Sequence, residues 1–181
     1  MGYFTSLLQR KFKDVAGKRY ETVVKEYREF LLTEEEMMLP EIHSILMPLD
    51  YFVQEIPPAL FDILSAYEGA TVSVVYIIDM EVIRIVEDTL DEAAIAEFRR
   101  KREAYGNDIL DRATEALETA GLTVKSRMFS GKKFDHVIQL AGDHDLIAVS
   151  KRFAATMTDV APVSPVTMKL AQMVTTPMIV Y

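Results

Sequence analysis

The sequence predicts an α/β domain over residues 43–181, built on a five-stranded parallel sheet with helices on both faces. Short apolar runs bounded by turn residues recur along this part of the chain, and amphipathic helical patterns separate them. This alternation is typical of βαβ crossovers, which place successive strands parallel. Before residue 43 the pattern is helical alone, so residues 1–42 are predicted to form a separate amphipathic helical extension.

The extension carries apolar residues at helical spacing over residues 3–31, through Phe4, Leu8 and Phe12 and again through Tyr20 and Val24. Basic residues beside this apolar face are compatible with a helix lying on a membrane surface (Arg10, Lys11, Lys13, Lys18 and Arg19). Interspersed glutamates weaken that interpretation. We expect the extension to pack on its own domain or on a partner subunit, with membrane contact by residues 3–31 as the alternative.

The first βαβ unit is predicted between residues 44 and 79. Residues 44–50 form a short apolar run that ends in Asp50, which indicates a buried strand. Pro57 and Pro58 then begin a helix that reaches Tyr67, since proline is favoured in the first turn. The β-branched run over residues 71–79 is the second buried strand.

The remaining elements follow in the same alternation. Residues 91–119 are a long charged helix that ends before Gly121. After it, strands and shorter helices are predicted in turn: strand 122–129, helix 134–141, strand 145–150, helix 165–174 and strand 177–181.

Composition excludes several classes of function. The chain has no cysteine, so it has no disulfide, no thiolate metal ligand and no cysteine nucleophile, and this fits a cytoplasmic protein. No apolar run approaches the roughly 18 residues of a membrane span. The net charge is −8, and residues 43–181 hold 13 Lys and Arg against 20 Asp and Glu. Because binding to nucleic acid depends on neutralising phosphates, nucleic acid is not expected as a partner.

In a parallel sheet, ligands bind beyond the carboxyl ends of the strands, where the strand order reverses. This rule selects Asp50, the segment from Ile77 to Asp79, and the segment after Ser150. Asp50 and Asp79 are either a pair of catalytic carboxylates or, as we favour, helix-cap and turn residues. No metal site and no nucleophile elbow is predicted, so the sequence gives no positive sign of an enzyme.

Asp143, His144 and Asp145, with His136 eight residues before His144, match no zinc spacing. We interpret them as surface polar residues.

The ordered set of strands resembles the universal stress protein family, a Rossmann-like group related to the adenine nucleotide alpha hydrolases. The first two strands carry the resemblance in Ile45–Asp50 and Val74–Asp79. Ala120–Val124 with Gly131 match the next turn and strand. Asp145–Val149 and Thr176–Val180 match the last two strands. The resemblance covers residues 43–181.

The resemblance implies that Asp50 and the backbone at Ile77 hold adenosine, and that a loop of the form Gly-x2-Gly-x9-Gly-Ser/Thr holds the phosphates. Glycine is needed there because a side chain would block the approach of the backbone to phosphate oxygens. In this chain Ser150 and Phe153 take the first two glycine positions. Val163 takes the third, or Ser164 if one residue is inserted, which puts Pro165 where the hydroxyl donor belongs. The usual ATP cradle is therefore absent.

What remains is a degenerate nucleotide site made of Asp50, Ile77, Ser150, Lys151, Arg152 and Ser164. No bound cofactor is predicted, although ATP or AMP stays open. Lys151 and Arg152 are either an ordinary solvated loop or, together with Lys132 and Lys133, an attraction for an anion.

Two hypotheses follow: a noncatalytic stress-response protein that acts through dimerisation and protein partners, or a sensor of AMP, adenosine or another small anion. The terminal edge strand over residues 177–181 predicts a homodimer, as the resemblance also implies.

Overall fold

The computed structural model describes residues 41–53, 55–67, 69–155 and 162–181. Residues 42–181 form one compact unit. The extension predicted over residues 1–42 lies almost entirely outside the described residues, and so does its predicted membrane or partner contact.

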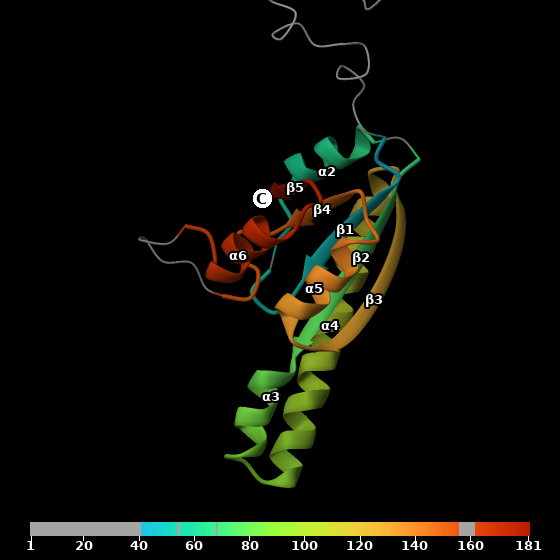
Figure 1. The fold of residues 1–181 in the computed structure, drawn as a ribbon. Helices are drawn as coiled ribbons and strands as arrows, with labels where there is room; N and C mark the ends of the chain where they lie inside the picture. Colours follow the sequence, from blue (N-terminus) through green and yellow to red (C-terminus); the bar gives the residue numbers. More distant parts are fainter. Residues whose placement is uncertain (1–40, 54, 68, 156–161) are drawn as a thin grey trace, which may run out of the picture. The chain divides into compact units, whose positions relative to one another are not determined.

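The strands are β1 (Ser44–Leu49), β2 (Thr71–Asp79), β3 (Thr123–Gly131), β4 (Leu146–Val149) and β5 (Met178–Val180). They form one sheet in the order β3-β2-β1-β4-β5, and every neighbouring pair is parallel (Figure 1). The predicted α/β class and five-stranded parallel sheet are confirmed. The strand order reverses between β1 and β4, so the carboxyl ends of these two strands mark the expected ligand position.

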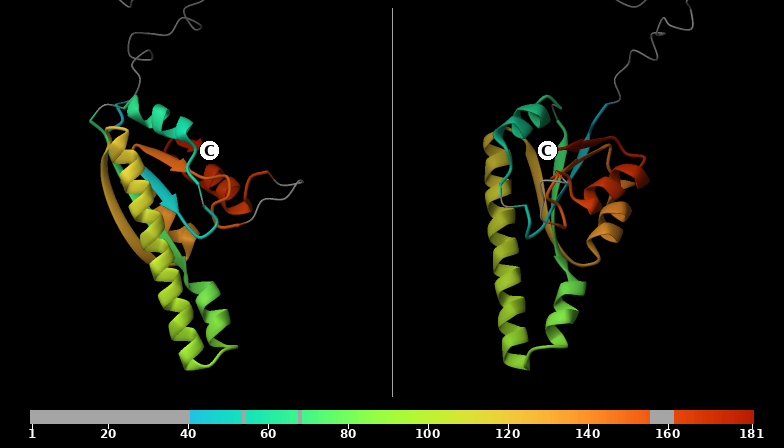
Figure 2. Two further views of the ribbon diagram at one scale, coloured as in Figure 1. Left: turned by 180° about the vertical axis from the view of Figure 1, so that it is seen from behind. Right: turned by 90° about the vertical axis from the view of Figure 1, so that its left-hand side faces the viewer.

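Helices cover both faces of the sheet, as predicted. The helices α2 (Pro58–Ser65) and α4 (Glu92–Thr119) lie on one face, and α5 (Lys133–Ala141) and α6 (Pro165–Met173) lie on the other (Figure 2). Right-handed crossovers explain the division, because the chain moves from β1 towards β3 and then returns to β5 across the sheet. Crossovers that run towards β3 place their helices on one face, and crossovers that run towards β5 place theirs on the other.

One further helix, α3 (Met80–Glu87), is absent from the sequence prediction. It continues directly from β2, so its Val and Ile residues prolong a β-branched run that is typical of a strand. Asp79 makes the break: its Oδ1 accepts a hydrogen bond of 3.0 Å from the backbone N–H of Glu81 and caps the helix. Together with the first turns of α4, α3 projects beyond the sheet (Figures 1 and 2).

The core lies between the sheet and its helices and is centred on β1 and β2, which are buried almost throughout. At Gly106 the long helix α4 approaches β2 so closely that an added Cβ would lie 2.6 Å from the ring of Tyr76 and 2.8 Å from Cε of Met128. Glycine is required there for packing. Among the described helices, none has the length and apolarity needed to cross a bilayer.

Candidate functional site

Asp50 follows β1 at the point where the strand order reverses, and its side chain is fully buried. Three donors from the chain itself surround the carboxylate. Oδ1 accepts from the backbone N–H of Phe52 at 3.0 Å, and Oδ2 accepts from the N–H of Ala154 at 2.8 Å and from Nζ of Lys133 at 2.7 Å. The carboxylate that the family resemblance assigns to adenosine is therefore bonded within the fold.

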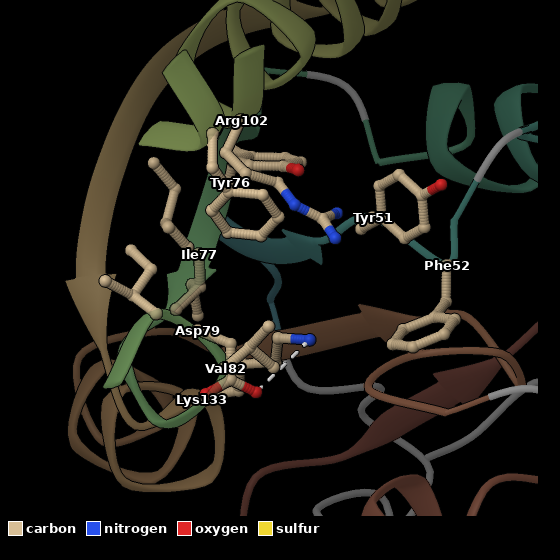
Figure 3. A pocket seen from close by; sticks show the side chains of 11 residues that line it. Tyr51, Phe52, Tyr76, Ile77, Asp79, Val82, Arg102 and Lys133 are labelled. Carbon is tan, nitrogen blue, oxygen red and sulfur yellow. Dashed lines mark ion pairs between the residues drawn. The ribbon is translucent and has the colours of Figure 1, made fainter. Parts of the chain in front are cut away.

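Lys133 is the first residue of α5, and only 7% of its side chain is exposed. Its Nζ also lies 3.6 Å from Oδ2 of Asp79 (Figure 3). One ammonium therefore joins the carboxylates of Asp50 and Asp79. Its Nζ is also 5.0 Å from the centre of the Phe52 ring. Lys133 had been considered as part of an anion attraction, and this is wrong, because its charge is already paired with acids in the interior.

The two aspartates have structural roles as well. Asp79 caps α3, and Asp50 closes a turn through its bond to Phe52. The preferred interpretation of both residues as cap and turn groups is confirmed. They do lie close together, as the paired-carboxylate alternative required, but Lys133 occupies the space between them.

Burial raises the pKa of the Asp50 carboxyl above its ordinary value, and the nearby Lys133 ammonium opposes the rise. Burial also raises the pKa of the Tyr76 hydroxyl, and the charge of Asp50 adds to that rise. The site is thus a desolvated polar cluster in which the charges of Asp50 and Lys133 influence the pKa values of their neighbours.

Beside this cluster lies a cavity of about 60 Å³, lined mainly by aromatic and aliphatic side chains. Ile77 is buried and contributes to its wall. The guanidinium of Arg102 lies 3.9 Å from the ring centre of Tyr51 and 5.0 Å from that of Phe98, and it closes one side (Figure 3). Charged side chains from α4 and α5 thus stand at the end of β2, where the resemblance places adenosine.

The loop from β4 to α6 is held by its own hydrogen bonds. Phe153, at the second glycine position of the resembled motif, is fully buried in the core. Ala154 has a φ of 67°, a conformation that usually favours glycine, and it directs its N–H to Asp50. The loop therefore keeps one left-handed residue but uses its N–H within the fold.

Ser164 is likewise used by the fold. Its Oγ donates to the carbonyl of Phe153 and accepts from the N–H of Thr167 at 3.0 Å, which caps α6. Thr167 in turn donates to the carbonyl of Ser150 at 3.0 Å. These buried bonds use the Ser164 hydroxyl, the Thr167 hydroxyl and the Thr167 N–H within the fold.

Ser150, Lys151 and Arg152 line a second and larger hollow of about 460 Å³, together with Tyr181 and residues 53 and 55–58. Lys151 and Arg152 are exposed, and Asp50 does not line this hollow. The six predicted site residues are thus divided: Ile77 lines the small cavity beside Asp50, three residues line the larger hollow, and Ser164 caps a helix.

Asp143, His144 and Asp145 lie just before β4, and Asp145 links this segment to the start of β1. Oδ2 of Asp145 accepts hydrogen bonds from the N–H groups of His43 and Ser44 and from the Ser44 hydroxyl, and these bonds lower its pKa. His144 contacts the carbonyl of Leu140 at 2.7 Å, and His136 lies against Phe129. Within the described ranges, no group of three or more acidic or histidine side chains could hold a metal ion.

Sequence reasoning missed Arg102 and Tyr51 as parts of the site and misjudged Lys133. Arg102 belongs to a helix rich in exposed charges, so nothing in its pattern separates it from its neighbours. Lys133 lies 83 residues from Asp50 in the chain, and an apolar neighbour, Phe134, was the only local sign of burial.

Solved structures with this fold include universal stress proteins. The hypothetical protein MJ0577 gives a TM-score of 0.64 at 19% identity, over 78% of this chain and 96% of that one. UspA from Lactobacillus plantarum gives 0.59 at 16% identity, over 78% and 99%. A universal stress family protein from Arabidopsis thaliana, described with AMP bound, gives 0.51 at 10% identity, over 76% and 90%.

No protein-family model matches the chain, and no curated protein matches it either. The likeness therefore rests on three-dimensional structure at low sequence identity. Residues 42–181 of this chain have the fold of the universal stress proteins.

Proposed function

We propose that this protein is a noncatalytic, cytoplasmic regulatory protein of the universal stress type, which acts through dimerisation and protein partners and does not bind ATP in the usual way. One observation carries the proposal: the Asp50 carboxylate accepts three hydrogen bonds from its own chain and is fully buried. A nucleotide would have to displace Lys133 and leave buried charges without partners, which costs several kcal/mol, on the order of 3–5.

Calorimetric titration of the full chain with ATP, ADP, AMP and adenosine, in the presence of magnesium, tests this proposal. We expect no heat of ATP binding and no shift in melting temperature with ATP. Tight ATP binding would contradict the argument from the loop and from Lys133. Turnover of a nucleotide or phosphoester in the same samples would contradict the noncatalytic role.

Dimerisation is proposed through β5 and residues 177–181. On one side β5 pairs with β4, and no other strand of the described residues pairs with its outer side. Apolar side chains lie exposed on β5 and on the neighbouring helix α6: Val180 is 43% exposed, Met168 50% and Met173 61%. An unpaired edge strand next to apolar surface is suited to pairing with a second copy.

Sedimentation velocity tests this interface. The wild-type chain is expected to sediment as a dimer, and the double variant Met173→Glu with Val180→Lys as a folded monomer. Ile63→Glu, at an exposed apolar position on α2, is the control and should leave the dimer intact. A dimer that persists in the double variant would exclude this edge as the interface.

A second candidate function, a sensor of AMP or another small anion, is favoured by the hollow beside Lys151 and Arg152. The Arabidopsis thaliana structure with AMP bound has the same fold, which makes AMP the first ligand to test. If AMP binds as the resemblance implies, Asp50→Ala should abolish binding. Unchanged affinity in that variant would place the ligand elsewhere, and loss of affinity in Lys151→Ala would then assign it to the larger hollow.

A further inference from the structure

The helix α3 and the turn that follows it carry an apolar surface that no described residue covers. Val82 is 40% exposed and Ile85 65%, three residues apart on one side of α3, and Leu90 in the turn after the helix is 49% exposed, while Ile83 of α3 is buried. We call Val82, Ile85 and Leu90 the α3 stripe. Three of the eight large hydrophobic residues that are markedly exposed in the described chain belong to this short segment.

Acidic residues flank the α3 stripe in the sequence. Glu81, Asp88 and Glu92 are exposed, and none of them forms an ion pair with another described residue. Glu87 is paired with Arg99 on α4, and Arg84 is the only basic residue of α3. The surface therefore combines an apolar centre with a negative rim, and a complementary partner would have an apolar centre with a positive rim.

The α3 stripe also borders a cavity. Val82 and Phe98 line the cavity of about 60 Å³ described above. This volume is several times the roughly 10–15 Å³ that one water molecule requires. Residues that contribute most to binding tend to fill desolvated pockets near the centre of an interface.

The helix is held in a defined position before any partner arrives. Asp79 caps its first turn, and Lys133 contacts the same aspartate at 3.6 Å. A fixed helix loses little conformational freedom on binding, which favours affinity.

We propose that the α3 stripe is a docking surface for an amphipathic basic segment of a partner protein, with an apolar side chain in the cavity beside Val82 and Lys or Arg against Glu81, Asp88 and Glu92. The inference rests on the proposed function, because it names the chemistry of the partner that a noncatalytic protein of this kind would need. Helices with apolar residues at positions i, i+3, i+4 and i+7 bind apolar surfaces of partner proteins through that face.

The test uses two labelled synthetic helices of about 18 residues with the same leucine spacing. One has lysine at the flanking positions and the other has glutamate. Fluorescence anisotropy with the full-length chain should show binding of the lysine peptide, weakening as salt is raised, and at least about tenfold weaker binding of the glutamate peptide. Equal binding of the two peptides, or binding of neither, would overturn the proposal.

Variants locate the site. Ile85→Glu should weaken binding of the lysine peptide at least about tenfold, as expected for a central interface residue. The matched control is Ile63→Glu, which places the same charge at a position 48% exposed on α2 and should not change the affinity. An equal loss in both variants would show that the peptide does not recognise α3. If Ile85→Glu instead dissociates the homodimer in sedimentation, the surface contacts a second copy and the proposal is wrong.

Failure of this inference can be told apart from failure of the proposed function. A chain that is dimeric and gives no heat with ATP, yet binds neither peptide, overturns the docking surface alone. A chain that binds ATP tightly overturns the proposed function, whatever the peptides do.

Discussion

The two hollows at the carboxyl end of the sheet use their charged residues in opposite ways. Around Asp50, the buried Lys133 pairs with the carboxylates of Asp50 and Asp79, and the neighbouring cavity has a volume of about 60 Å³. Around Lys151 and Arg152 the basic groups are exposed, and the hollow holds about 460 Å³. A single loop contributes to both, since Ala154 bonds to Asp50 while Lys151 faces the larger hollow.

The comparison teaches that the residues at the resembled glycine positions are used inside the fold. Phe153 fills the core, and Ser164 satisfies the carbonyl of Phe153. Buried polar groups need partners, and here the chain itself supplies the donors. Stability should therefore depend on the Asp50 side of the loop, and anion binding on the Lys151 side.

The largest effect is expected from Phe153→Gly, which restores a glycine at the resembled phosphate position. Removal of a fully buried phenylalanine side chain lowers the free energy of unfolding by about 3–5 kcal/mol. Glycine lowers it by a further ~0.5–1 kcal/mol, because it makes the unfolded backbone more flexible. Urea denaturation measures the loss. The variant should still not bind ATP, because Lys133 remains on Asp50, and ATP binding by this variant would contradict the role given to Lys133.

Lys133→Met should destabilise the fold by about 3–5 kcal/mol, since it leaves two carboxylates without their shared cation in a desolvated site. The neighbouring exposed Lys132 provides the control, and Lys132→Met should leave the urea midpoint unchanged. Equal effects of the two substitutions would show that the buried ion pair does not stabilise the domain.

The fold could be predicted from the sequence because its strands are short apolar runs separated by clear turn and helix signals. The run over residues 44–50 and the glycine stop at Gly121 each have a local physical cause. The helix α3 could not be predicted, because Val82, Ile83 and Ile85 favour a strand and only the cap at Asp79 changes the outcome.

The candidate site was predictable only in part. Asp50 was selected because strand ends meet where the strand order reverses, which is a rule of topology. Its pairing with Lys133 depends on how α5 packs against the sheet. No sequence pattern in either segment indicates that the two side chains lie within hydrogen-bond distance. Phe153 was recognised as incompatible with a phosphate loop, but its burial in the core depends on the tertiary structure.

The dependence of stability on pH should differ in sign between Asp50 and Asp145. Burial raises the pKa of Asp50 in the folded state, so the native protein holds that proton longer than the unfolded chain. The contribution of Asp50 to stability is then fully present below the unfolded value near 3.9 and falls as the pH rises through the folded pKa. For Asp145, hydrogen bonds from His43 and Ser44 lower the pKa, so its contribution is present above the unfolded value and is lost as the pH falls.

Urea midpoints between pH 3 and pH 7 for the wild type, Asp50→Asn and Asp145→Asn measure this difference. The advantage of the wild type over Asp50→Asn should shrink as the pH rises, and its advantage over Asp145→Asn should grow. Parallel profiles for the two variants would contradict the assignment of opposite shifts.

The smallest effect on stability is expected from the double variant Lys151→Ala with Arg152→Ala. Both side chains are exposed, and neither forms an ion pair among the described residues, so the urea midpoint should not change. If the larger hollow attracts anions, the same variant should lose affinity for AMP or inorganic phosphate in calorimetry. The control is the double variant Lys125→Ala with Arg127→Ala on the exposed part of β3, which should keep the wild-type affinity. A fall in stability without a change in anion binding would reverse the comparison, because the basic residues would then support the fold and leave the hollow without a function in binding.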